Sequence, residues 1–320
     1  MHDVTFNCMG CEMRLLAEGV DRGAIDTARR LLDAIDARLS RFRPDSELSR
    51  LNADPRPTVA ASPLLRAAVG AALWAAERSR GLVDPTLLGD LERAGYTASM
   101  TGAPRAALAA AIAAAPARAA AGARGDRRWR AVQIDNAAAS ITRPPGLRLD
   151  TGGTTKGLAA DAAAPLLAGA RRLVVDCAGD LRVAGAPAFD VVVEHPLSGA
   201  PATTLRVGTG AVATSGLARR VWQGAGGRAV HHLLDPATGE PAWTGLISAT
   251  ATAPTALEAE TLAKTALLCG PAGARRVLGR GGGVLIHDDG SVERVGAAAR
   301  PVLRLRRDRL RPATPVGAAA

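Results

Sequence analysis

Apolar residues recur at helical spacing in the first quarter of the chain and predict two amphipathic helices. The first covers residues 24–39, and its apolar stripe consists of Ile25, Leu31, Leu32, Ile35 and Leu39. The second covers residues 62–80 and ends at Gly81, since glycine commonly stops a helix. Between them, a Pro-Asp turn leads into a short polar helix within residues 42–52. Each long helix therefore has one face to bury in a core.

Shorter apolar runs predict strands along most of the remaining chain. The first candidate is one strand over residues 4–18, in which apolar and polar residues roughly alternate. Later candidates are VQID, LRLD, LVVDCAG, FDVVVEH, LRVGTGAVATSG and ISATATA, interleaved with helices near residues 157–168 and 256–268. This order predicts an α+β fold in which mixed or antiparallel sheets pack against helices.

Two segments of biased composition depart from this pattern. Residues 104–126 are rich in alanine and predict a helix followed by a mobile linker, which together form an insertion in one domain over residues 1–302. Residues 303–312, LRLRRDRLRP, are strongly basic. We expect residues 303–320 to be a solvated, disordered tail.

Composition and charge restrict the class of protein. Hydrophobic residues make up 48% of the chain, but only one Tyr, three Phe and four Trp are present, so Ala, Val and Leu must build most of the core. The formal net charge of +10 favours an anionic partner, yet aromatic residues are too few to stack nucleic-acid bases, and we expect no nucleic acid.

No run of 18 or more apolar residues occurs, and the N-terminus lacks an apolar stretch of signal-peptide length. We therefore expect no membrane span and a cytoplasmic location.

The four cysteines, Cys8, Cys11, Cys177 and Cys269, are too sparse for a disulfide scaffold and predict reduced thiols. Cys8 and Cys11 form a CxxC pair. Zinc would lack ligands there, because no second pair and no nearby histidine accompany it, and we interpret these thiols as structural.

Lysine is nearly absent, which draws attention to the two lysines that are present. Of 40 Lys and Arg residues, only Lys156 and Lys264 are lysine. Lys156 lies in LDTGGTTKGLAAD (149–161), which predicts a strand, a glycine-rich turn and a helix. The free amides of such a turn bind anions, phosphate above all, although the P-loop spacing is not met. A tight turn without a ligand is the alternative interpretation.

Three further stretches contain candidate chemistry. HHLLDPATGEP (231–241) combines two histidines with a turn that is rigid even without a ligand. GAVATSG (210–216) predicts a strand that ends in a hydroxyl group but lacks a hydrolase nucleophile pattern. Glu260 and Lys264 have the i, i+4 spacing of a helical ion pair. On a surface this pair stabilises little, but its neighbours are apolar, and a buried pair is more typical of a ligand site or a switch.

These stretches, together with MGCEMRL, FRPDSELSRLN, DPT, VDCAGDLRV and AETLAKTALLCG, occur in an order that resembles the ApbE-type FAD:protein FMN transferase family over about residues 6 to 296. The resemblance implies an ApbE-like architecture related to the T-fold. It implies an enzyme that splits the pyrophosphate of FAD, transfers FMN to a Ser or Thr hydroxyl of an acceptor protein with a flavinylation motif, and releases AMP, with Mg²⁺ on the diphosphate. Some members instead hydrolyse FAD to FMN and AMP.

The resemblance also implies site residues. The FAD contacts fall on Met9, Phe42, Leu82, Val83, Asp84, Asp150, Lys156, His232 and Leu233. Phe42 offers a ring face to flavin or adenine. Asp84 and Asp150 are expected to accept hydrogen bonds from ribityl, ribose or adenine groups. His232 is the candidate base for the hydroxyl proton.

The metal positions depart from the family pattern, in which an Asp and a Thr of an AD-x-x-x-T helix bind Mg²⁺ together with a carbonyl of the glycine turn. Here these positions are Glu260, Lys264 and Gly153. Glu260 and Gly153 remain possible Mg²⁺ ligands, whereas lysine cannot bind the ion. Our hypothesis is that the Lys264 ammonium, held by Glu260, replaces the ion and takes part in catalysis. The alternatives are that Lys264 faces away from a bound Mg²⁺, or that the protein binds FAD without transferring it.

Overall fold

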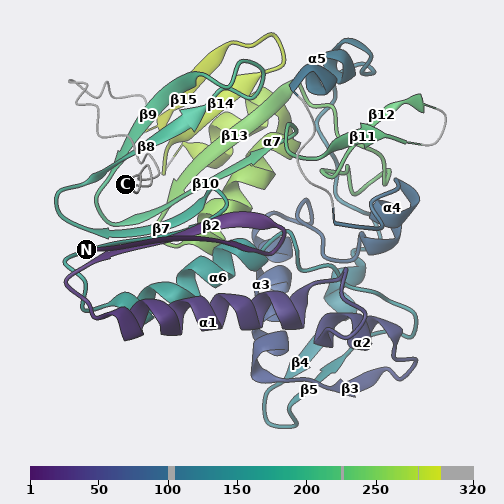
Figure 1. The fold of residues 1–320 in the computed structure, drawn as a ribbon. Helices are drawn as coiled ribbons and strands as arrows, with labels where there is room; N and C mark the ends of the chain where they lie inside the picture. The colour runs from purple at the N-terminus through teal and green to yellow at the C-terminus, as the bar shows by residue number, and fades with distance from the viewer. Residues whose placement is uncertain (100–104, 225–226, 280, 297–320) are drawn as a thin grey trace, which may run out of the picture.

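An eight-stranded antiparallel sheet forms the centre of the protein (Figure 1). We describe a computed structural model for residues 1–99, 105–224, 227–279 and 281–296. The strand order is β1-β2-β6-β7-β10-β13-β14-β15. These strands cover His2–Cys8 (β1), Cys11–Glu18 (β2), Arg172–Cys177 (β6), Asp180–Gly185 (β7), Gly210–Gly216 (β10), Leu246–Ala253 (β13), Gly283–His287 (β14) and Val292–Val295 (β15).

Three small antiparallel sheets flank the central one. Their strands are Thr58–Ala60 (β3), Gln133–Asp135 (β4) and Ser140–Thr142 (β5) in the order β3-β5-β4, Phe189–Glu194 (β8) with Pro201–Val207 (β9), and Val221–Gln223 (β11) with Ala229–His231 (β12). The helices are Arg22–Leu39 (α1), Glu47–Ala53 (α2), Pro63–Arg78 (α3), Leu88–Arg93 (α4), Arg105–Ala113 (α5), Thr155–Ala163 (α6) and Ala256–Leu278 (α7). The predicted α+β fold is confirmed.

Helices α1 and α6 cover one face of the sheet at the β1–β2–β6 end (Figure 1). The predicted stripe of α1 is buried there at Ile25, Leu32, Ile35 and Leu39, while Leu31 is only partly buried. Asp21 caps this helix, because its side chain accepts a hydrogen bond from the backbone of Ala24. Ser62 caps α3 in the same way. The helical periodicity of the sequence therefore identifies the face that is buried.

The opposite face of the sheet is covered as well, by the β8–β9 ribbon. Phe189, Val191 and Val193 of β8 belong to the same buried cluster as Leu16 and Val174 of the central sheet. A sheet that is covered on both faces needs apolar residues on both faces, which explains continuous apolar runs such as LVV at 173–175. The long helix α7 packs along β10 and β13. It is interrupted at Gly270 (φ 68°), next to Pro271, close to the predicted end of this helix.

The first predicted strand is wrong in one respect, because residues 4–18 belong to a hairpin of two strands. Met9 and Gly10 form its two-residue turn with φ values of 52° and 68°, and Cys8 pairs with Cys11 across it. A left-handed Met9 is uncommon and was not recognised from the sequence. Cys8 is buried, its thiol donates to the carbonyl oxygen of Leu32 at 3.4 Å, and burial raises the pKa of this thiol to about 12. These features fit a structural thiol.

Two other expectations also differ from the structure. LRLD (147–150) is an extended loop and not a strand: Asn52 brackets Leu149 with two side-chain hydrogen bonds of 2.8 Å, which take the place of a sheet ladder. The alanine-rich segment forms α5 as predicted. The stretch after it was expected to be a mobile linker, but its backbone is hydrogen-bonded to the body of the protein, with Ala119 donating to Trp243 at 3.0 Å and Ala121 to Leu268 at 2.8 Å. The basic tail at 303–320 lies outside the described residues.

Candidate functional site

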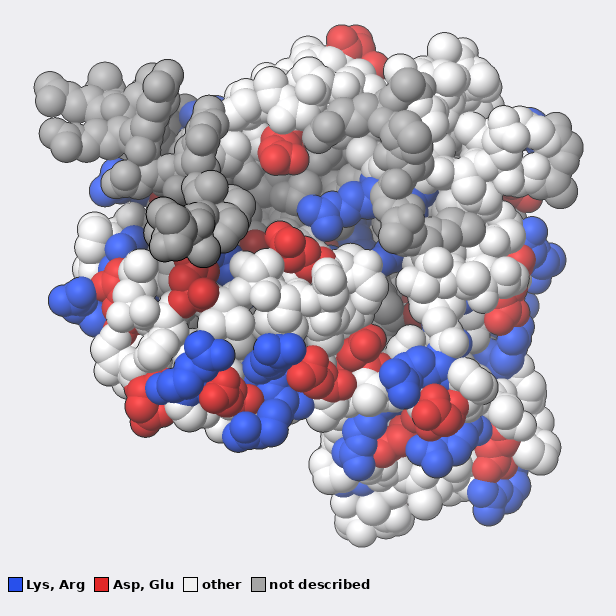
Figure 2. Space-filling model, in the orientation of Figure 1, with Lys and Arg blue, Asp and Glu red and all other residues white. Residues whose placement is uncertain are grey.

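A cleft of about 1590 Å³ opens where the β1–β2 turn, the glycine-rich turn before α6, the end of β10, strand β8 and helix α7 meet. Figure 2 shows a hollow in the middle of the face that is turned toward the viewer, with Lys and Arg side chains along it. The cleft is larger than most small-molecule sites, which measure roughly 300–1,000 Å³. It therefore has room for an extended ligand.

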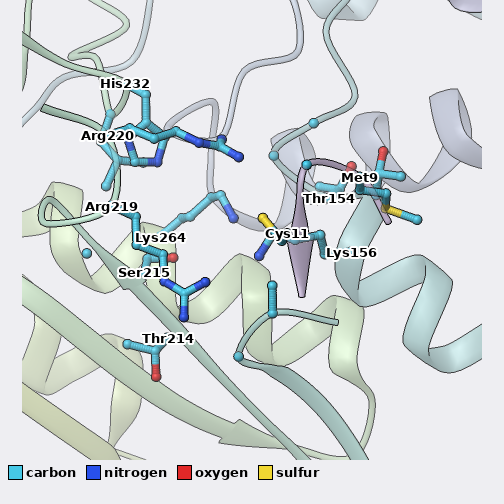
Figure 3. Close-up of a pocket in the computed structure, with 18 of the residues that line it drawn as sticks. Met9, Cys11, Thr154, Lys156, Thr214, Ser215, Arg219, Arg220, His232 and Lys264 are labelled. Carbon is cyan, nitrogen blue, oxygen red and sulfur yellow. The ribbon is translucent and has the colours of Figure 1, made fainter. Parts of the chain in front are cut away.

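Most of the site residues expected from the sequence line this single cleft. They are Met9, Phe42, Leu82, Val83, Asp84, Asp150, Gly153, Lys156, His232, Leu233 and Lys264. Glu260 does not line the cleft. It is fully buried behind the lysines. Residues that are distant in the chain are thus brought together, with Lys264, His232 and two arginines on one side of the cavity and Lys156, Thr154 and Met9 on the other (Figure 3).

The two lysines of the chain meet at one carboxylate. Lys264 donates from Nζ to Glu260 Oε1 at 2.8 Å, and Lys156 Nζ lies 3.9 Å from the same oxygen while it hydrogen-bonds Asp180. The side chains of Lys156 and Lys264 are 20% and 14% exposed, so each ammonium reaches the cleft. Burial alone would lower the pKa of Lys156, but the carboxylates of Asp180 and Glu260 outweigh burial and raise it to about 12. The Lys156 ammonium is therefore charged at neutral pH.

Close packing of α6 against α7 creates this arrangement. A Cβ on Gly157 would lie 2.6 Å from the carbonyl oxygen of Ala256, so only glycine allows the two helices to approach this far. At this contact the Gly157 amide donates to Glu260 Oε2 at 2.8 Å. Burial raises the pKa of Glu260 and the neighbouring Lys264 ammonium opposes the rise. The donors at both oxygens, Lys264 and the Gly157 amide, favour the ionised form of the carboxylate.

The residues at the expected metal position do not fit Mg²⁺. The ion requires a near-octahedral set of oxygen ligands. Both oxygens of Glu260 are already engaged by protein donors, and Lys264 faces Glu260 instead of turning away from it. Lys264 also lies against the glycine turn, since its Cε is 3.7 Å from where a Cβ of Gly153 would be. Within the described part of the chain, no group of three or more His, Cys, Asp or Glu side chains could hold a metal ion.

A stack of aromatic and guanidinium groups forms another part of the wall. The Arg41 guanidinium lies 4.2 Å from the Phe42 ring centroid and 4.4 Å from that of Tyr96, and its Nε is 3.3 Å from Asp150 Oδ2. Asp150 also accepts a hydrogen bond from the Gly152 amide at 2.8 Å. Asp150 is therefore occupied by protein donors, and one face of Phe42 is covered by a cation.

Asp84 has one free oxygen. Its Oδ1 accepts hydrogen bonds from the backbone and hydroxyl of Thr86, at 2.8 and 2.7 Å, whereas Oδ2 is buried without a partner. Burial raises the pKa of this carboxyl. An unpartnered buried acceptor in a cleft is suited to a donor from a ligand.

The two neighbouring histidines have different surroundings. His231 is fully buried with its ring 4.7 Å from that of Trp243, and burial lowers its pKa to about 3. His232 lines the cleft. Burial lowers its pKa well below the usual value, and the positive charge of Arg220 lowers it further. Its Nδ1 is buried without a partner, which leaves Nε2 as the ring nitrogen available to the cleft. His232 is therefore neutral, as a proton acceptor must be.

Some residues of the site were not singled out from the sequence. Asp180 lies within the motif VDCAGDLRV, but its partner Lys156 is 24 positions away in the chain, and only the packing of α6 against the β6–β7 hairpin brings the two together. Arg219 and Arg220 follow the β10 motif after two intervening residues, and their adjacency was a signal that could have been used. Tyr96 is the only tyrosine, yet nothing in its local sequence indicates that it lies beside Phe42.

The chain is similar to known proteins in sequence and in fold. The family model described as "ApbE family" matches residues 9–285. Among solved structures, an ApbE protein from Thermotoga maritima is 23% identical with a TM-score of 0.75, covering 92% of this chain and 96% of that one. The flavinyl transferase ApbE from Pseudomonas stutzeri is 21% identical with a TM-score of 0.72, covering 92% of this chain and 94% of that one.

The flavin transferase ApbE from Vibrio cholerae is 20% identical with a TM-score of 0.68 and covers 92% of this chain and 96% of that one. No curated protein matches the sequence. At these identities the structures show a shared fold, and the family model spans most of the chain. The chain belongs to the ApbE family.

Proposed function

We propose that this protein transfers FMN from FAD to a Ser or Thr hydroxyl of an acceptor protein and releases AMP. The observation that supports this most directly is the convergence of both lysines, the glycine-rich turn and a neutral histidine on one cleft large enough for a dinucleotide. The flavin transferases from Pseudomonas stutzeri and Vibrio cholerae share the fold. No described helix is long and apolar enough to cross a membrane.

The chemistry assigns a role to each group. The acceptor oxygen attacks the phosphorus of the FMN half. A new P–O bond forms as the bond to the bridging oxygen breaks, and AMP leaves with that oxygen. Nε2 of His232 takes the hydroxyl proton. Lys156, Lys264 and the amides of the glycine turn stabilise charge on the phosphoryl oxygens, since phosphoryl transfer depends mainly on positioning and electrostatics.

The remaining predicted contacts hold the rest of FAD. Asp84 Oδ2 is suited to a ribose or ribityl hydroxyl, or to an adenine amino group, because this buried oxygen lacks a donor. Met9, Leu82, Val83 and Leu233 offer apolar surface, and the Phe42 ring, which also lines the cleft, is the aromatic group for flavin or adenine. Asp150 contributes by holding the Arg41 guanidinium and the Gly152 amide in place, since both contact its carboxylate.

We further propose that the Lys264 ammonium takes the place of Mg²⁺ here. Support comes from Glu260, whose oxygens bind Lys264 and the Gly157 amide and leave no free carboxylate for the ion. The reaction is then expected to proceed in the presence of a chelator.

The test is AMP release from FAD by the purified protein, with and without Mg²⁺, and with and without an acceptor domain that carries a Ser/Thr flavinylation motif. The proposal expects AMP in a one-to-one ratio with FMN covalently attached to the acceptor. AMP release without an acceptor would instead identify a FAD hydrolase. Tight FAD binding with no AMP under any condition would identify a flavin-binding protein and overturn the transfer reaction.

A further inference from the structure

Six Lys and Arg side chains line the cleft, and two of them have no carboxylate partner among the described residues. Arg41, Arg43, Lys156 and Lys264 pair with Asp150, Asp45, Asp180 and Glu260 respectively. Arg219 and Arg220 make no ion pair and donate no side-chain hydrogen bond to another described residue. A cation left unpaired inside a cleft is available to an anionic ligand.

The turn that presents these arginines is firmly attached. It directly follows β10, and the backbone of Leu217 donates to Ile247 at 3.0 Å while the Leu217 side chain is 1% exposed. Arg220 then donates its backbone amide to Leu217 at 3.3 Å, which closes the turn. The two guanidinium groups are thus held on one wall, on either side of Lys264 (Figure 3).

Each arginine has its own surroundings. The Arg219 guanidinium lies 3.9 Å from where a Cβ of Gly179 would be, and its charge opposes the rise in the pKa of Lys156 across the cleft. The carboxylate of Asp176 is close enough to be influenced by Arg219, but it accepts a hydrogen bond from the Gly179 amide and forms no ion pair with the arginine. Arg220 lies on the His232 side, 5.5 Å from the Tyr96 ring centroid.

Charge balance indicates the ligand. Lys156 and Lys264 are neutralised by Asp180 and Glu260, so the buried lysine pair contributes no net charge. Arg219 and Arg220 add two positive charges that no ion pair with a described carboxylate offsets, although carboxylates such as Asp84 and Asp176 also line the cleft. The diphosphate of a dinucleotide carries one negative charge on each phosphate, and a guanidinium binds phosphate oxygens through two parallel hydrogen bonds.

We propose that Arg219 and Arg220 each bind one phosphate of the diphosphate, and that this pair makes the site selective for a diphosphate over a monophosphate. The inference rests on the proposed function for the identity of the ligand, FAD. It adds a reason for product release. Once the diphosphate is split, AMP has one phosphate and contacts only one of the two arginines, and the flavin half likewise contacts only one.

The experiment measures dissociation constants of the full chain for FAD, FMN and riboflavin by flavin fluorescence, and for ADP by calorimetry. The variants are Arg219→Gln, Arg220→Gln and the double variant. Arg43→Gln is the matched control, because Arg43 also lies at the cleft but pairs with Asp45. Each single change is expected to weaken FAD and ADP binding about 10-fold, and the double change about 100-fold, since a lost charge-assisted hydrogen bond has roughly this effect. Riboflavin, which has no phosphate, is expected to bind all variants within about 2-fold, and the preference for FAD over FMN is expected to disappear in the double variant.

Two outcomes would contradict the inference. One is a double variant that binds FAD and ADP as tightly as Arg43→Gln does. The other is a parallel loss of riboflavin binding, which would mean that the substitutions damage the cleft as a whole. If the wild-type chain binds ADP through these arginines but no flavin, the diphosphate site stands and the flavin transfer function fails.

Discussion

The cleft contains two groups of cations that differ in how the protein treats their charge. Lys156 and Lys264 are largely buried, and Asp180 and Glu260, each about 1% exposed, neutralise them. Arg219 and Arg220 lie on a surface turn without a carboxylate partner among the described residues. The lysine group is assembled during folding, because its carboxylates belong to the core. The arginine group is completed only by a ligand.

This difference predicts where substitutions act. An ion pair buried in the core is costly to break, because the remaining charge stays in a medium of low dielectric. Removal of an unpaired surface cation changes the stability of the protein little. We therefore expect substitutions in the lysine group to reduce both stability and activity, and substitutions in the arginine group to reduce binding alone.

The largest effect is expected for Glu260→Gln. The change leaves two ammonium groups without one of their carboxylates and is expected to lower the free energy of unfolding by about 3–5 kcal/mol. Urea denaturation followed by circular dichroism measures this loss. Arg219→Gln serves as the matched variant from the other group and is expected to change stability by less than about 0.5 kcal/mol. Equal losses in the two variants would remove the distinction between the groups.

His232→Gln is expected to lower the rate of FMN transfer about 10²–10⁴-fold, the usual contribution of a general base. FAD affinity should change little, because the imidazole is neutral and contributes no charge to phosphate binding. Single-turnover transfer and FAD titration separate the two quantities. A matched loss of affinity and rate would show that His232 positions FAD and does not take the proton.

Lys264→Met tests whether the ammonium replaces a metal ion. In a chelator, AMP release by the variant is expected to fall about 10- to 100-fold, because one positive charge next to the diphosphate is removed. Added Mg²⁺ should restore part of the rate, since Glu260 Oε1 then loses its ammonium partner. A wild-type protein that is inactive in chelator and active with Mg²⁺ would contradict the replacement.

At neutral pH the smallest effect is expected from His231, because its contribution to stability changes only when the pH is lowered. The pKa of this buried imidazole is about 3, below its value of about 6.5 in the unfolded chain, so the unfolded state binds the extra proton. The contribution of His231 to stability is therefore complete above about pH 6.5 and falls as the pH drops toward 3, by up to about 1.4 kcal/mol per pH unit.

His231→Phe keeps a ring against Trp243 and is expected to flatten this dependence, whereas His2→Gln, outside the core, should not. Chemical denaturation between pH 7 and pH 4 provides the measurement. An unchanged pH slope in His231→Phe would assign the effect to other groups.

Local interactions account for what could be predicted from the sequence. The buried stripe of α1 and its end near Leu39 follow from helical periodicity, and the Glu260–Lys264 contact follows from i, i+4 spacing within one helix. Of the two failures, one has a local cause and the other a long-range one. The hairpin turn at Met9–Gly10 uses a left-handed Met, and the apolar run LRLD is bound by the Asn52 side chain where a neighbouring strand was expected.

The sequence by itself therefore determined the helices and most of the strands, the family, and a set of candidate site residues, most of which line one cleft. Only the tertiary structure decided that Glu260 lies behind the cleft and not in it, that Asp180 reaches Lys156, and that Arg219 and Arg220 have no carboxylate partner among the described residues. The reason is physical. Spacing along one helix determines which side chains meet within that helix, whereas a contact between elements depends on sheet register and on how closely two helices approach, which here requires Gly157.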